Sequence, residues 1–353
     1  MMKKEANIKV LIVDDSFLMR RFLKEILDSD FEIEVVGEAR NGEEAYKKAQ
    51  KLKPDVITMD YQMPDMTGAE VTKKIMTMKS PVPIVIMISA YTKEGAEATL
   101  ESLRAGAVDF VQKPSGEISL NIDSIKEEVV DRVKIAAKAK LKKLNKDQGE
   151  SKKRIKGKIK KDIEAVVIGA STGGPPVVEE ILKGLSEELK VSIFIAQHMS
   201  RNFTRRFAER LNGESQLDTK EASDGEKVEI GKAYVSPGNS NTLIKRKVFQ
   251  DNAVFVQIND ASVEDTSTPS IDMLMESVAK TYQGKVMGII LSGMGEDGQK
   301  GMAMIKEKGG YCIAQDPSEA VIDSMPESVI EEGTTDEVLL TSEIIARIKE
   351  FEE

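Results

Sequence analysis

Acidic, hydroxyl and amine side chains follow short apolar runs in the first third of the chain, where their types suit phosphate chemistry. Asp14 and Asp15 follow one β-branched run, and Asp60 follows a later one. Carboxylates that lie together repel one another unless a hard cation sits among them, and Mg²⁺ prefers oxygen ligands. Ser89 and Lys113 end two further runs. A hydroxyl and an ammonium beside an acidic metal site would suit a phosphoryl group on one carboxylate.

A second set of residues has the types that nucleophilic hydrolysis requires. Ser171 stands in Gly169-Ala-Ser171-Thr-Gly173, a G-x-S-x-G pattern typical of a tight strand-to-helix turn that exposes a serine. His198 is the chain's single histidine and the sole candidate of that type for a general base near neutral pH. Asp297, with Glu296 as its rival, is the carboxylate expected to orient His198.

Each of these residues also has an alternative interpretation. The glycine-rich turn could bind a phosphate or a nucleotide, although it lacks both the G-x-G-x-x-G and the Gly-Lys-Ser/Thr patterns. Asp297 could instead cap the helix that follows it. The order Ser171, His198, Asp297 excludes an α/β-hydrolase, because that fold needs its histidine after the acid. The chymotrypsin and subtilisin orders also fail, since both place histidine before serine.

Two alternations of strand-like and helix-like segments must position these side chains. In each alternation we expect a parallel sheet with helices on both faces, whose strand ends bring functional groups to one edge. Between residues 215 and 270 short strands, such as Lys232–Val235 and Val254–Ile258, predict a hairpin insertion. The strands expected for the alternations are Ile8–Val13, Ile33–Val36, Val56–Met59, Ile84–Ile88, Val108–Val111, Ile163–Ile168, Val191–Ala196, Val286–Leu291 and Tyr311–Ala314.

Length and composition predict two soluble domains. The chain has 353 residues, and its net charge of −9 disfavours a general nucleic-acid binder. One cysteine excludes an intrachain disulfide and suits a reducing cytoplasm, and no apolar run reaches the length of a membrane span. Residues 132–161 hold fourteen Lys or Arg and two acids, which favours a helix tail and a solvated linker. We expect domains at residues 1–125 and 162–353, with helix tail and basic linker at 126–161.

Residues 8–115 resemble a response-regulator receiver domain. The resemblance rests on Asp14-Asp15, on Val-Ile-Thr-Met-Asp60-Tyr-Gln-Met-Pro, on Ser89 and on Lys113-Pro114. It implies an α/β domain of the (βα)5 flavodoxin-like type, in which Asp60 accepts phosphate from a histidine kinase. It also implies that Ser89 and Lys113 contact the phosphoryl oxygens, and that Mg²⁺ is held by Asp14, Asp15, Asp60 and the backbone carbonyl of Gln62.

Residues 162–349 resemble the catalytic domain of chemotaxis protein-glutamate methylesterases. The matching strings include Gly-Ala-Ser-Thr-Gly-Gly-Pro, Gln-His-Met, Tyr-Val-Ser-Pro-Gly, Pro-Ser-Ile-Asp and Gly-Met-Gly-Glu-Asp-Gly. The resemblance implies a doubly wound α/β domain with a β-hairpin insertion. It makes Ser171 the nucleophile, His198 the base and Asp297 its partner. Thr172 would supply an oxyanion N–H, and Met294 would lie in the active-site loop.

The two resemblances together imply a cytoplasmic, phosphorylation-regulated hydrolase of chemotaxis adaptation. Its substrates would be glutamyl methyl esters on chemoreceptors, with glutamine deamidation as a second activity. Its phosphodonor would be a chemotaxis histidine kinase. Mg²⁺ would serve the receiver, and ester hydrolysis would need no cofactor, nucleic acid or membrane insertion. Two rival classes are a DNA-binding response regulator, for which no helix-turn-helix spacing is evident, and an inactive hydrolase domain that only binds receptors.

Overall fold

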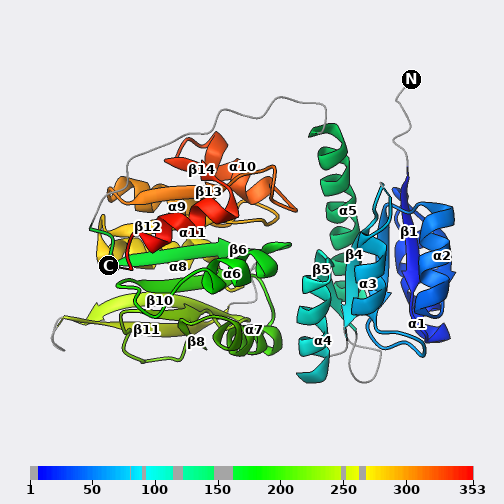
Figure 1. Ribbon diagram of the computed structural model, residues 1–353, viewed down its shortest axis with the longest axis horizontal. Coiled ribbons are helices and arrows are strands. Elements are labelled where there is room, and N and C mark those ends of the chain that lie inside the picture. The colour runs from blue at the N-terminus through cyan, green and yellow to red at the C-terminus, as the bar shows by residue number, and fades with distance from the viewer. Residues whose placement is uncertain are drawn as a thin grey trace. The chain divides into compact units, whose positions relative to one another are not determined.

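The computed structural model describes residues 7–79, 81–89, 93–113, 122–146, 162–247, 252–261 and 268–352. Pro114 and residues 147–161 of the expected linker lie outside the described residues. The chain divides into two compact units, Met1–Gly149 and Glu150–Glu353. Each unit has its own sheet and its own flanking helices, as Figure 1 shows.

The first unit is built on a five-stranded parallel sheet in the order β2-β1-β3-β4-β5. This is the flavodoxin-like order: the chain adds strands on one side of β1 and then, from β3 onward, on the other side. Functional groups gather at such a reversal, where the crevice outside the carboxyl ends of the strands opens. The strands are β1 Ile8–Val13, β2 Ile33–Ala39, β3 Val56–Asp60, β4 Ile84–Ser89 and β5 Asp109–Gln112.

Helices cover both faces of this sheet, with α1 packed beside α5, and with α2 beside α3 and α3 beside α4. Local signals set their starts: the Ser16 side chain accepts the Met19 N–H at α1, and Thr67 forms a capping box with Glu70 at α3. Buried aliphatic side chains fill the space between the sheet and the α1 and α5 helices. The helices are α1 Phe17–Asp28, α2 Gly42–Leu52, α3 Gly68–Met76, α4 Lys93–Arg104 and α5 Ile122–Lys146.

The second unit has a seven-stranded sheet in the order β14-β13-β12-β6-β7-β9-β8, in which every neighbouring pair is parallel. The first strand of this unit, β6, lies between β7 and β12, so the strand order reverses there. The strands are β6 Ala165–Ala170, β7 Ser192–Gln197, β8 Asp218–Glu221, β9 Lys232–Val235, β12 Val286–Ile290, β13 Tyr311–Gln315 and β14 Glu337–Leu339.

A separate antiparallel pair, β10 Ser240–Lys247 and β11 Ala253–Asp260, supplies the expected hairpin insertion. The expected strand Lys232–Val235 is confirmed, although it is not part of the hairpin. It forms β9, which pairs in parallel with both β7 and β8 and so extends the main sheet. Four residues leave too short a pattern to distinguish a hairpin arm from a parallel strand.

Helices cover both faces of the second sheet as well. On one face α6 contacts α7 and α11, and on the other α9 contacts α8 and α10. The α8–α10 face buries a hydrophobic cluster, which also takes in Ile244 and Val256 of the hairpin. The helices are α6 Gly174–Lys183, α7 Arg201–Glu214, α8 Ile271–Tyr282, α9 Gln299–Glu307, α10 Ser324–Glu331 and α11 Thr341–Lys349.

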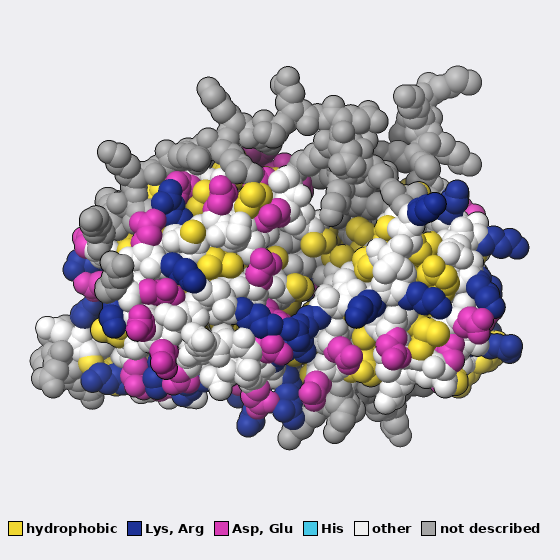
Figure 2. Space-filling model, in the orientation of Figure 1, with side chains coloured by type: hydrophobic (Ala, Val, Ile, Leu, Met, Phe, Trp, Pro, Cys, Tyr) yellow, Lys and Arg dark blue, Asp and Glu magenta, His cyan; other side chains and the backbone are white. Residues whose placement is uncertain are grey.

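Neither a membrane-spanning helix in the described ranges nor a field of one charge on the face drawn in Figure 2 is found. Within the described ranges, no helix combines the length and the apolar character needed to cross a bilayer. Acidic and basic side chains are interspersed over the face seen in Figure 2. That mixture does not favour a polyanion-binding surface on this face, in line with the net charge.

Candidate active sites

The first site is an acidic cluster at the strand reversal of the five-stranded sheet. Asp14 and Asp15 follow β1 and Asp60 ends β3, and one carboxylate oxygen from each lies within 4.8 Å of the others. Asp14 and Asp60 are buried, whereas Asp15 is exposed. Burial is the main cause that raises the pKa of Asp60; the Asp14 charge adds to it, and Lys113 opposes it.

Lys113 joins this cluster directly, whereas the Ser89 hydroxyl is bonded elsewhere. The Lys113 ammonium lies 2.8 Å from an oxygen of Asp14 and 2.8 Å from an oxygen of Asp60. The Ser89 hydroxyl donates to the Gly95 carbonyl at 3.0 Å and accepts from the Thr99 hydroxyl at 2.6 Å, so it is bonded to α4. To donate to a phosphoryl oxygen, the Ser89 hydroxyl would have to give up its hydrogen bond to the Gly95 carbonyl.

The donor set of this cluster fits Mg²⁺. Three carboxylates at one sheet edge supply hard oxygen ligands, and a single ammonium leaves their charge only partly compensated. Asp14, Asp15 and Asp60 would hold the ion, which would neutralise negative charge around a phosphoryl group. Gln62 is exposed two residues beyond β3, and its carbonyl as a ligand stays a prediction.

The second site begins at Ser171, which follows β6 at the strand reversal of the seven-stranded sheet. Gly173 is the N-cap of α6. Its φ of 77° is a backbone conformation that residues with a side chain rarely adopt. A Cβ at Gly293, in the loop after β12, would lie 2.8 Å from the Ser171 Cβ. Glycine at these two positions therefore permits the sharp turn and the close approach of the two loops.

His198 connects Ser171 with Asp297 across three strand ends. The Ser171 Oγ lies 3.1 Å from His198 Nδ1, and His198 Nε2 lies 2.8 Å from Asp297 Oδ2. All three side chains are buried or partly buried. An ionised carboxylate only accepts hydrogen bonds, so Nε2 must carry the proton in the neutral ring. Nδ1 is then free of a proton and can accept the one that Ser171 gives up.

Asp297 is held in the ionised form by its partners. Burial opposes its charge, but the hydrogen bond and the charge of His198, with backbone N–H donors, hold its pKa below the usual value. The donors are Ile271 and Asp272, whose N–H groups lie 2.9 Å from Oδ2 and Oδ1. These donors open α8, and a helix N-terminus favours negative charge. Asp297 therefore caps α8 and not its own helix, whose N-cap is Gly298.

Two buried side chains that the sequence analysis left without a role support this site. The Gln197 amide donates to the Ser171 carbonyl at 2.9 Å. The Ser292 hydroxyl donates to the Thr172 carbonyl at 2.8 Å and accepts from the Ile322 N–H at 3.0 Å. Both residues end or follow a strand beside the nucleophile turn. Their sequence positions could have indicated them, because Gln197 directly precedes His198 and Ser292 opens the loop that carries Asp297.

The remaining candidates lie in the surrounding loops. Thr172 is buried directly after Ser171, and its role as oxyanion donor stays a prediction. Met294 is 45% exposed in the loop after β12. Glu296, the rival of Asp297, is exposed, and it is Asp297 that lies within hydrogen-bond distance of His198.

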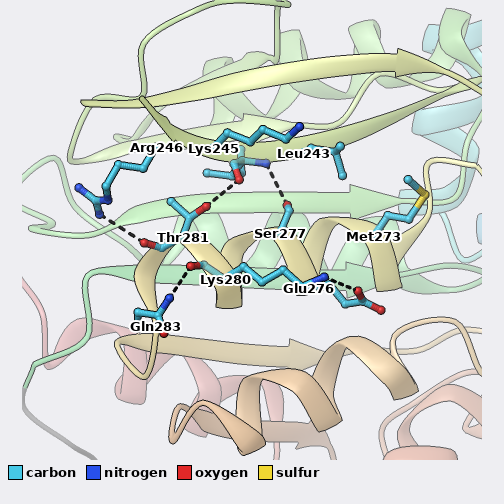
Figure 3. Close-up of a pocket in the computed structure, with 10 residues that line it drawn as sticks. Leu243, Lys245, Arg246, Met273, Glu276, Ser277, Lys280, Thr281 and Gln283 are labelled. Carbon is cyan, nitrogen blue, oxygen red and sulfur yellow. Dashed lines mark hydrogen bonds and ion pairs between the residues drawn. The ribbon is translucent and has the colours of Figure 1, made fainter. Parts of the chain in front are cut away.

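A groove of about 700 Å³ lies between β10 and α8, and the triad candidates do not line it. Figure 3 shows Ser277 and Thr281 of α8 bonded to the backbone of β10, with Lys245 and Lys280 beside them. The chemistry is thus expected at the sheet edge and not in this groove.

The fold and the two sites define a response regulator joined to a serine-hydrolase domain. Residues 166–348 match the family described as CheB methylesterase, and residues 10–122 match the response regulator receiver domain. The chain therefore belongs to the CheB methylesterase family and carries a receiver domain.

Relatives match the chain over nearly its whole length. A protein-glutamate methylesterase/protein-glutamine glutaminase of Methanococcus maripaludis is 42% identical over 98% of both chains. One of Thermotoga maritima is 41% identical, also over 98% of both. The crystal structure of the Thermotoga maritima CheB methylesterase catalytic domain matches with a TM-score of 0.51 and 37% identity, covering 53% of this chain and 97% of that one.

The acidic cluster generates a prediction about Mg²⁺. A ligand that binds only the folded state stabilises it, by about 1.4 kcal/mol at ten times its dissociation constant. We expect Mg²⁺ to raise the thermal unfolding temperature of the first unit, and Asp15→Asn to remove most of that rise. Glu34→Gln, at an exposed position in β2, is the matched control and should respond like the unaltered chain. An undiminished rise in Asp15→Asn would show that Asp15 is not a ligand.

Proposed function

We propose that this chain is a protein-glutamate methylesterase whose receiver domain regulates it through phosphorylation of Asp60. The observation that carries the proposal is the continuous hydrogen-bonded series from Ser171 through His198 to Asp297, in a chain of the CheB methylesterase family. Serine, imidazole and carboxylate in this order of contact are the parts of a nucleophilic hydrolase. Relatives that match almost end to end bear the methylesterase and glutaminase names.

The contacts of the three side chains support one step for each of them in ester hydrolysis. His198 Nδ1 takes the hydroxyl proton while Ser171 Oγ attacks the ester carbonyl, and Asp297 stabilises the imidazolium that forms. Backbone N–H groups near Thr172 would stabilise the oxyanion. The carbon–oxygen bond to the methoxy group then breaks, and His198 returns its proton so that methanol leaves.

Water completes the cycle by the same route in reverse. His198 removes a proton from water, which attacks the acyl carbon, and the proton finally returns to the Ser171 oxygen. The product is a glutamate side chain with one new negative charge. Glutamine deamidation needs the same steps with ammonia as the leaving group, so one site can carry both activities.

The receiver supplies the regulation. We infer that Asp60 accepts a phosphoryl group from a histidine kinase of the chemotaxis system, with Mg²⁺ held by Asp14, Asp15 and Asp60. Lys113 already contacts Asp60 and would compensate the added charge. The substrates would be methylated chemoreceptors, and the setting would be the cytoplasm. The proposal includes no nucleic acid as partner, no insertion into a membrane and no cofactor for ester hydrolysis.

The nucleophile prediction concerns methanol release from methylated receptor fragments. Ser171→Ala should lower the turnover by at least about 1,000-fold, because the attacking oxygen is lost. It should also abolish labelling by a fluorophosphonate. Ser186→Ala, in the loop after α6, is the control and should retain full turnover. If Ser171→Ala kept its turnover, the assignment of the nucleophile would be wrong.

The regulation prediction concerns a small-molecule phosphodonor supplied with Mg²⁺. Methanol release by the unaltered chain should increase, and Asp60→Asn should keep the basal rate without the increase. Equal release with and without the phosphodonor would leave the esterase intact and refute regulation through Asp60. A normal increase in Asp60→Asn would place the phosphoryl acceptor elsewhere.

A further inference from the structure

Two carboxylates of the hydrolase domain, one just before α9 and one in α8, each accept hydrogen bonds from the start of the other helix. Asp297 precedes α9, yet its oxygens accept the Ile271 and Asp272 N–H groups that open α8, each at 2.9 Å. Asp272 lies in α8, yet its Oδ1 accepts the Gly298 N–H at 2.9 Å and the Gly301 N–H at 2.8 Å, at the start of α9. Asp297 therefore holds the start of the helix that contains Asp272, and Asp272 holds the start of the helix that follows Asp297.

We propose that Asp272 is a positioning residue of the hydrolase, which acts by holding Asp297 in register with His198. The inference rests on the proposed function, because it assigns Asp272 to the same site. A shift of the Asp297 carboxylate would break the hydrogen bonds at the start of α8, and a shift of the Asp272 carboxylate would break those at the start of α9. Because α8 packs against α9, these hydrogen bonds fix the position of Asp297, whose carboxylate contacts the imidazole of His198.

The local sequence shows why the loop before α9 needs a hydrogen-bond acceptor from another helix. The loop that carries Asp297 contains Gly295 and Gly298, both with positive φ, so its backbone has much conformational freedom in the unconstrained chain. The N-cap of α9 is Gly298, which has no side chain to bind the free N–H groups of the first turn. Asp272 supplies that acceptor from a neighbouring helix, and it binds the residue directly after Asp297.

The arrangement brings two negative charges together, which a purely structural cap would not require. Burial is the main cause that raises the pKa of Asp272, and the Asp297 charge adds to it. A serine in the first turn could cap a helix without this repulsion. The carboxylate has two oxygens on a short side chain, and one of them bridges Gly298 and Gly301.

The test compares three variants of Asp272 in the full chain, by methanol release and by the rate at which a fluorophosphonate labels Ser171. Asp272→Ala should lower kcat and the labelling rate by about 10- to 100-fold with little change in KM, because small misplacements of reacting groups have effects of this size. Asp272→Asn keeps an acceptor oxygen in place and should restore most of the activity. Asp272→Glu keeps the charge but moves the oxygens, and should resemble Asp272→Ala.

The matched control is Asp336→Ala, which removes a carboxylate that accepts the Cys312 N–H at 2.9 Å near the start of β13. It should keep the kcat of the unaltered chain. Should Asp272→Ala not fold, the contrast between the Asn and Glu variants still decides. Equal activity in those two, or a loss confined to KM, would overturn the inference. Labelling without methanol release in the unaltered chain would refute the methylesterase proposal alone, since labelling rates would still test Asp272.

Discussion

The ionised carboxylate of Asp297 is the constraint on which the hydrolase site depends. A buried negative charge is costly unless several donors reach it. Here the donors are the imidazole of His198 and two backbone N–H groups at the start of α8. Because the carboxylate can only accept, it determines which nitrogen of His198 carries the proton, and hence which nitrogen faces Ser171. Asp297 thus links the start of α8 to the imidazole that contacts Ser171.

Both units solve the problem of assembling distant residues in the same way. In a parallel sheet all carboxyl ends lie at one edge, and a reversal of strand order opens a crevice there. The first unit reverses between β1 and β3, where Asp14 and Asp60 meet Lys113. The second reverses at β6, where Ser171 meets the loop after β12. One architectural rule therefore serves the proposed phosphoryl acceptor and the proposed nucleophile.

The same rule explains how far the sequence could predict the structure. The strands of the first sheet and most strands of the second, though not β8 or β14, were predicted from apolar runs. The gathering of Ser171, His198 and Asp297 was predicted from their places after such runs. The role of Asp272 was not, because its partners lie 26 and 29 positions along the chain. The place of β9 was also missed, since four residues do not reveal their strand partners. The Ser89 hydroxyl was expected near Asp60, but a strand pattern cannot tell that it bonds to α4.

The most direct test of this account is nitrogen and proton NMR of the imidazole, which one histidine per chain makes unambiguous. The account predicts that in the neutral ring Nε2 is protonated, with a strongly deshielded proton that disappears in Asp297→Asn, and that Nδ1 carries no proton. A neutral ring protonated at Nδ1, or an imidazole spectrum unchanged in Asp297→Asn, would contradict it.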